Sequence, residues 1–186
     1  MTPGQCETLM QALWPASEKG RLSVWAVLDC ARDPRIYRSL LASRLEFRCL
    51  YSGKLAPALE MVAPHLVELS PSNLLTATLV NEGWGQAWGV FLKIDDPHNL
   101  RHHLRKFLKV RDEDGRRLLF RYYDPRVLRA YLPTCTADEL RAVFGPIASF
   151  VMESAAPGRG LELGLRAQRL HVRHIDLAPE PLQAAT

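Results

Sequence analysis

Short apolar runs alternate with amphipathic runs along this chain, and three of the amphipathic runs begin at an Asp-Pro pair. An aspartate at the N-cap accepts a hydrogen bond from a free backbone N–H. Proline at the first helical position has no N–H to lose, and its φ already suits a helix. Each pair therefore predicts a helix start. The three pairs are Asp33-Pro34, Asp96-Pro97 and Asp124-Pro125.

The other patterns fill in the order of elements. Apolar and β-branched runs predict strands over residues 22–30, 46–51, 64–69, 88–94, 146–154 and 165–177. Helical spacing predicts helices over 5–14, 31–43, 70–83, 95–108, 124–132 and 136–145, the last with a capping box from Thr136 to Glu139. The turn "DEDG" within residues 109–123 predicts a hairpin.

This order predicts an α/β (α+β) fold. Strands alternate with helices, but the hairpin interrupts the alternation, which favours a mixed β-sheet flanked by helices over a pure doubly wound sheet. We expect an α/β domain over residues 1–132. Residues 133–186 form a small C-terminal lobe or extension in this interpretation, and the alternative that they belong to the same domain stays open.

Composition narrows the class of protein. The longest apolar runs, such as "LLTATLV", are far shorter than the roughly 20 residues that span a bilayer. The start "MTPGQCETLM" lacks the charged and apolar regions of a signal peptide. The four cysteines are scattered without a C-x-x-C pair. We therefore expect a cytoplasmic protein with free thiols.

The positive charge is concentrated in one region. The net charge is +4, and residues 97–130 hold ten Lys or Arg against four Asp or Glu. Such a surface attracts an acidic partner, either a protein or a nucleic acid. The alternative is a solvated helix face in an arginine-rich chain, where Arg outnumbers Lys nineteen to five.

The stretch "FRYYDPRVLRAYLP", residues 120–133, raises the question of chemistry most directly. Alternation over "LLFRYY" predicts that Arg121 and Tyr123 point to one face of a strand. Arg121 then pairs with Asp124 or with Asp29 at the end of the first strand, and a buried pair of this kind is structural. Capping accounts for Asp124 better than a catalytic or binding role does.

Several segments together resemble a known family. They are "WAVLDCARDPRIYRSLL", "CLYSG", "APHLVEL", "WGVFLKI", "LRHHLRKFLKVRDEDGRRLLFRYYDPRVLRAYLP" and "VFGPI". In this order, over about residues 22–150, they are similar to the bacterial type VI secretion effector adaptors, also called Tap or Tec chaperones.

The resemblance implies a cytoplasmic, non-enzymatic chaperone that loads a toxic effector onto the secretion spike, a VgrG trimer often tipped by a PAAR protein. It also implies that Asp29, Arg121, Asp124 and Pro125 occupy signature positions, which we interpret as scaffold. Its partners would be the effector and a spike component, without a membrane.

Other chemistry finds little support in the sequence. His98 and His102 share a helix face, but H-E-x-x-H is absent and no third ligand is evident, while His171 and His174 should face opposite sides of a strand. No nucleophile elbow or phosphate loop is present. We expect no catalytic residue, metal or cofactor. The alternative function is a nucleic-acid-binding or uncharacterised enzymatic α/β domain.

Three residues are candidates for partner binding. Trp84 lies in the glycine-rich stretch "NEGWGQAWG", where an exposed aromatic would anchor an interface. Core packing is the competing interpretation for this side chain. Arg101 and Arg105 lie on the basic helix, where they would steer an acidic partner.

Overall fold

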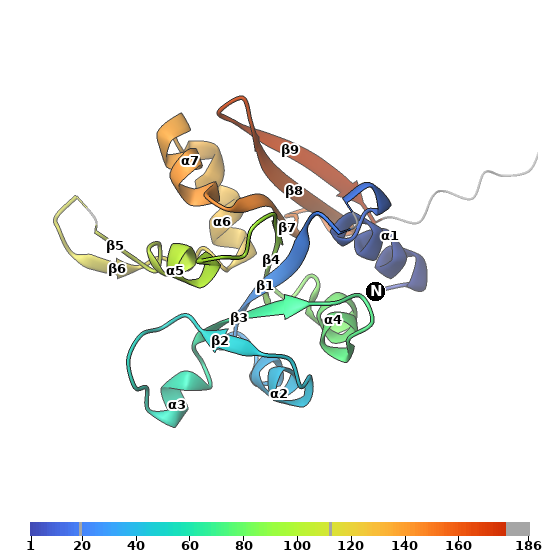
Figure 1. Cartoon of the computed structure of the whole chain (residues 1–186), viewed down its shortest axis with the longest axis horizontal. Coiled ribbons are helices and arrows are strands. Elements are labelled where there is room, and N and C mark those ends of the chain that lie inside the picture. The colour runs from blue at the N-terminus through green and yellow to red at the C-terminus, as the bar shows by residue number, and fades with distance from the viewer. Residues whose placement is uncertain (19, 112, 178–186) are drawn as a thin grey trace, which may run out of the picture.

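The computed structural model describes residues 1–18, 20–111 and 113–177. These residues form a seven-stranded sheet in the order β2-β3-β1-β4-β7-β8-β9, together with a separate two-stranded sheet, β5-β6 (Figure 1). The strands of the main sheet are β1 (Ser23–Asp29), β2 (Phe47–Cys49), β3 (Pro64–Leu69), β4 (Gly89–Ile94), β7 (Ile147–Glu153), β8 (Arg159–Arg166) and β9 (Arg169–Asp176). The α+β class is thereby confirmed.

Helices cover both faces of the main sheet (Figure 1). One face packs on α5 (Leu100–Arg105), α6 (Pro125–Tyr131) and α7 (Ala137–Phe144). The other packs on α1 (Pro3–Leu13), α2 (Pro34–Ala42) and α4 (Leu74–Thr78), which continues into a π-helical turn over Leu79–Gly83. A four-residue helix, α3 (Pro57–Glu60), lies between β2 and β3.

The sheet is antiparallel throughout, so the expected parallel pairing within a mixed sheet is wrong. Strand β1 shows why the pattern misled. Val24, Ala26 and Leu28 pack in the α1–α2–α4 layer, while Val27 packs in the α5–α7 layer. A strand covered on both faces is a continuous apolar run, which is typical of parallel sheets, although this one is antiparallel.

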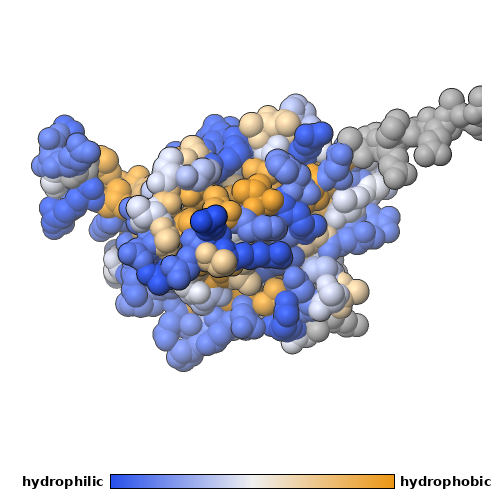
Figure 2. Space-filling model, turned by 90° about the horizontal axis from the view of Figure 1, so that it is seen from above, coloured by the Kyte–Doolittle hydropathy of each residue, from blue (hydrophilic) through white to orange (hydrophobic). Residues whose placement is uncertain are grey.

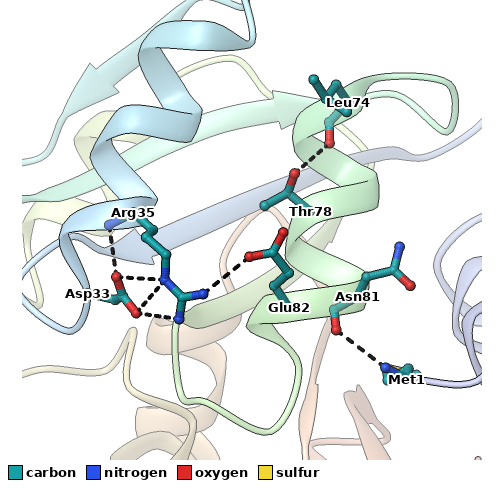
Figure 3. Close-up of polar contacts among 7 residues, drawn as sticks. All are labelled: Met1, Asp33, Arg35, Leu74, Thr78, Asn81 and Glu82. Carbon is teal, nitrogen blue, oxygen red and sulfur yellow. Dashed lines mark hydrogen bonds and ion pairs between the residues drawn. The ribbon is translucent and has the colours of Figure 1, made fainter.

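Two of the three Asp-Pro predictions are confirmed at the N-caps of α2 and α6. The oxygen of Asp33 accepts from Arg35 N at 2.8 Å, and the Arg35 guanidinium also reaches Glu82 at 3.3 Å (Figure 3). Arg35 further stacks over the Trp88 ring at 5.0 Å. The α2 cap is therefore also a link to the π-helical turn.

The third Asp-Pro prediction is wrong in its position. Asp96 accepts a hydrogen bond from His98 N at 2.8 Å, but α5 begins only at Leu100. Its N-cap is Asn99, whose φ of 63° is left-handed. Because Asn99 leaves the helical region, the bond from Asp96 closes a separate turn before the helix.

The hairpin predicted around "DEDG" is confirmed as β5 (Lys109–Arg111) and β6 (Arg117–Leu119). The strand ends earlier than the alternation predicted. Phe120 N still donates to the Leu108 carbonyl at 3.0 Å, but Arg121 lies outside the strand and Tyr122 and Tyr123 form a turn. Both of these tyrosines are buried, so the predicted alternation of faces across them is wrong.

The C-terminal part of the chain continues the main sheet. Strand β7 pairs with β4, and β8 and β9 follow as a hairpin. The single strand expected over 165–177 is wrong, because the chain turns at Ala167 and Gln168, whose φ angles are 46° and 61°. Two positive φ angles are typical of a type I′ turn, which usually carries Asn-Gly. The division at residue 132/133 remains a prediction.

Candidate functional site

Asp29 lies at the end of β1 with 1% of its surface exposed, and it forms an ion pair with Arg121. The guanidinium of Arg121 comes from the segment that follows β6. The hydrogen bond to Asp29 raises the pKa of Arg121 above its usual value. This pair was one of the two that the sequence predicted. It ties the end of a central strand to the segment that precedes α6.

Asp124 begins α6 and is also buried. Its Oδ1 accepts from Arg126 N and from Arg126 Nε, both at 2.9 Å, and its Oδ2 accepts from Arg126 Nη2 at 2.6 Å. Burial alone would raise the pKa of Asp124, but these hydrogen bonds hold it below its usual value. Asp124 therefore serves as a charged helix cap.

The two tyrosines between Arg121 and Asp124 belong to the core. Tyr122 and Tyr123 pack edge-to-face at 5.6 Å between ring centroids. Burial raises the pKa of both phenols, so they stay neutral. Arg121, Tyr122, Tyr123 and Asp124 thus form a scaffold that joins β1, the end of β6 and α6.

One cysteine–histidine contact lies elsewhere in the core. Cys30 Sγ is 3.4 Å from His65 Nδ1, and both residues are buried. Burial raises the pKa of the Cys30 thiol to about 12 and lowers the pKa of His65. Since the thiolate is the nucleophilic form, this contact is suited to packing.

An open groove of about 620 Å³ lies beside the scaffold, between the segment around α3 and the α5–β5 region. We call it the basic-rimmed groove. Its apolar lining residues are Leu50, Tyr51, Leu55, Leu59, Leu108 and Leu119, of which Leu50 and Leu108 are buried. Leu59 and Leu119 are 45% and 49% exposed, and both line the same groove.

Positive charge lies on the α5–β5 side of the groove. Arg105, Lys106 and Lys109 line the groove together with His102, and none of its described lining residues is acidic. Lys109 pairs with Leu119 across the β5–β6 hairpin, which projects from the body of the molecule. Figure 2 shows hydrophobic surface where this hairpin leaves the body and hydrophilic surface at its tip. The groove thus combines apolar contacts with a cationic rim.

The two predicted steering arginines differ in position. Arg105 lines the groove. Arg101 instead donates from Nε and Nη2 to the Cys49 carbonyl, at 3.0 Å and 2.8 Å, so it ties α5 to the end of β2. The structure therefore does not bring Arg101 to the groove, although it is only one helical turn from Arg105.

Trp84 is partly buried against the α1–α2–α4 layer. Its ring stacks on Phe91 at 6.2 Å between centroids and also contacts Gly160, where a Cβ would lie 3.0 Å from the indole. This surrounding is typical of core packing, on the opposite face of the sheet from α5. A role of Trp84 in partner binding stays a prediction.

His98 and His102 line a shallow hollow at α5 together with His103, the residue that follows His102. His103 Nε2 lies 2.9 Å from the Val143 carbonyl and links α5 to α7, while His98 and His102 are exposed. No group of three or more His, Cys, Asp or Glu side chains within residues 1–18, 20–111 and 113–177 is arranged to hold a metal ion.

The sequence analysis missed the apolar part of the groove. Leu55 and Leu59 lie in a segment for which no element was predicted. A signal was present in the hairpin, because Leu118 and Leu119 are adjacent in a strand and must point to opposite faces. Both are exposed, at 48% and 49%.

Comparison with known proteins identifies the family. The family model described as "Domain of unknown function (DUF4123)" matches residues 24–142, well over half of the chain. The chain belongs to this family. The match includes the scaffold of Asp29, Arg121 and Asp124 and all residues of the groove. No curated protein and no solved structure matches the chain.

The matched region of the DUF4123 family ends inside α7, so α1 and strands β7 to β9 lie outside it. In the part of the chain that the structure describes, no helix has both the length and the apolar character needed to cross a membrane.

Proposed function

We propose that this protein is a non-catalytic adaptor that binds a type VI secretion effector in the cytoplasm and helps to load it onto the VgrG/PAAR spike. The basic-rimmed groove carries the proposal, because it offers apolar side chains beside the cations Arg105, Lys106 and Lys109, a combination that suits a short protein segment. Membership of the DUF4123 family and the resemblance to effector adaptors supply the biological setting.

The groove suits an amphipathic segment with acidic residues. Burial of one Leu-sized side chain contributes about 1.5–3 kcal/mol, so two or three anchors against Leu59 and Leu119 provide most of a moderate affinity. The cations at Arg105, Lys106 and Lys109 then act at the rim, where charge mainly sets the rate of encounter and the choice of partner.

Quantitative pull-down from the native bacterium tests the proposal. The tagged chain is compared with the variants Leu59→Glu and Leu119→Glu, and bound proteins are identified by mass spectrometry. Leu74→Glu is the matched control, because Leu74 is 71% exposed on α4 and lies outside the groove. We expect the unaltered chain and the control to recover a toxin and a spike component, and each groove variant to recover at least tenfold less.

Two outcomes would contradict the proposal. Equal recovery by the control and by both groove variants would show that the partner binds elsewhere. A folded, unaltered chain that recovers only nucleic acid, or no protein partner, would show that the adaptor function is wrong.

A further inference from the structure

Strand β9 forms one end of the main sheet and pairs only with β8 among the described residues. All eight of its residues are in register with β8, so its outer edge extends over roughly 27 Å at 3.4 Å per residue. The strand at the other end, β2, has three residues. The edge of β9 is therefore the longer of the two sheet edges, and five strands lie between β9 and β2.

The register shows which backbone groups face outward. Leu177 N donates to the Gly158 carbonyl at 2.9 Å, directly opposite in the register, so these two residues form a hydrogen-bonded pair. In an antiparallel ladder such pairs alternate. The N–H and C=O groups of Leu170, Val172 and His174 consequently point away from β8.

The side chains along this edge sort onto two faces. Leu170 and Val172 lie on the α5–α7 face, and Val172 is 43% exposed. His171 and Arg173 lie on the opposite face with Lys93, and Arg169 has the same parity. Figure 2 looks onto this end of the molecule and shows hydrophobic and hydrophilic surfaces side by side.

Natural sheet edges are usually protected by proline, a bulge or charge. Strand β9 contains no proline, and its register with β8 has no bulge. The strand is protected by charge: Arg169 and two histidines lie along it, Arg173 is ion-paired with Glu162 of β8, and Asp176 is its one acidic residue. Like charges disfavour pairing with a second copy of the same strand and favour an acidic segment.

We propose that the outer edge of β9 binds an extended acidic segment of a partner protein as an additional antiparallel strand. The added residues opposite Leu170, Val172 and His174 are apolar and form the backbone hydrogen bonds, and the acidic residues between them lie beside Arg169 and His171. This surface is separate from the basic-rimmed groove. The proposal for β9 rests on the proposed function in one respect: an adaptor needs a second surface for its second partner.

A synthetic peptide probes the edge. The probe is an eight-residue peptide of alternating Asp and Val with blocked ends, and binding to the full chain is followed by fluorescence anisotropy and by amide hydrogen exchange. We expect slower exchange at the amides of Leu170, Val172 and His174. Methylation of the valine nitrogens should weaken binding at least tenfold, whereas methylation of the aspartate nitrogens, which point away from β9, should not.

Variants of the chain supply the second arm. Val172→Pro removes an outward N–H and leaves the bonds to β8 in place, since proline is tolerated at a sheet edge. Val172→Ala keeps the N–H and is the control. We expect Val172→Pro to bind the peptide at least tenfold more weakly and Val172→Ala to bind it normally. Arg169→Glu should also bind it more weakly. Leu59→Glu should bind the peptide normally, so failure of the groove proposal is distinguishable from failure at the edge.

Three outcomes would overturn the inference. Equal binding of the methylated and unmethylated peptides would exclude strand addition. Equal binding of a Lys-Val peptide would exclude the acidic partner. A concentration-dependent dimer in light scattering, with the same three amides protected in the absence of peptide, would show that a second copy occupies the edge.

Discussion

Asp29 and Asp124 are buried carboxylates, and the fold provides each of them with an arginine partner. Burial of an unpaired charge is costly, and so each aspartate depends on its partner. The arginines remain partly exposed, with Arg121 at 41% and Arg126 at 50% of their side-chain surface. In each pair, a buried aspartate therefore contacts an arginine whose side chain is partly exposed to solvent.

Replacement of Asp124 tests its role as a cap. We expect Asp124→Ala to lower the free energy of unfolding by about 0.5–2 kcal/mol, because the backbone N–H of Arg126 loses its acceptor. Asp124→Asn keeps a side-chain oxygen at the N-cap and should lose less. Urea denaturation of the three proteins measures the differences. An unchanged stability of Asp124→Ala, together with lost partner binding, would make Asp124 a contact residue instead.

The charge of Asp124 also predicts a pH dependence. Its folded pKa lies below the ordinary 3.8, so the ionised carboxylate stabilises the fold above about pH 4. This contribution is lost as the pH falls through the folded pKa. We expect the stability difference between the unaltered chain and Asp124→Asn to be constant near neutrality and to shrink below about pH 4. A difference that is the same at pH 3 and pH 7 would contradict this assignment.

At the scale of elements, a buried lysine connects the region that the DUF4123 family model matches, residues 24–142, to segments on either side of it. Lys93 of β4 is 1% exposed, and its Nζ lies 3.1 Å from Glu18 Oε2 and 3.0 Å from Glu162 Oε1. Glu18 belongs to the 3₁₀ turn Ala16–Glu18, and Glu162 belongs to β8. The Lys93 cation therefore links β4 to both flanking segments.

The two glutamates should differ in their contribution to stability. Glu162 also accepts from Ser149 Oγ at 2.7 Å and pairs with Arg173, and its side chain is 14% exposed against 26% for Glu18. We expect Glu162→Gln to cost about 3 kcal/mol and Glu18→Gln less than about 1 kcal/mol, measured by urea denaturation. Equal losses of unfolding free energy in Glu18→Gln and Glu162→Gln would contradict this prediction.

At the scale of the molecule, the basic excess of residues 97–130 divides into structural and surface roles. Arg101, Arg121 and Arg126 are held by a carbonyl or a carboxylate in the fold. Arg105, Lys106 and Lys109 instead line the groove. The part of the excess that lines the groove is therefore smaller than the sequence count indicates, and the exposed Arg111, Arg116 and Arg117 lie on the β5–β6 hairpin outside it.

Charge reversal at the rim tests steering of the partner. We expect Arg105→Glu and Lys106→Glu to slow association with the effector more than they speed dissociation, and the effect should fade at high salt. Arg44→Glu, in the exposed loop between α2 and β2, makes the same change in net charge outside the groove. Surface plasmon resonance with the captured effector separates the two rates. A change confined to the dissociation rate would contradict steering.

The elements that local chemistry specifies were predicted well. The caps at Asp33, Asp124 and Thr136 were found because a side chain and a backbone N–H two or three residues away form the bond. The hairpin of β8 and β9 was missed because Ala167 and Gln168 adopt positive φ without the usual Asn or Gly. That turn is determined by the pairing of the two strands rather than by its own residues.

The amino-acid sequence by itself determined where most helices begin, which runs are buried and where the positive charge is concentrated, because these depend on neighbours a few residues apart. The tertiary structure was needed for the antiparallel order, for the exposure of Leu59 and Leu119 in one groove, and for the position of β9 at the end of the sheet among the described residues. A leucine has the same hydrophobicity in a core and in a groove. Its exposure depends on whether a distant segment covers it, and that follows from the packing of the whole chain.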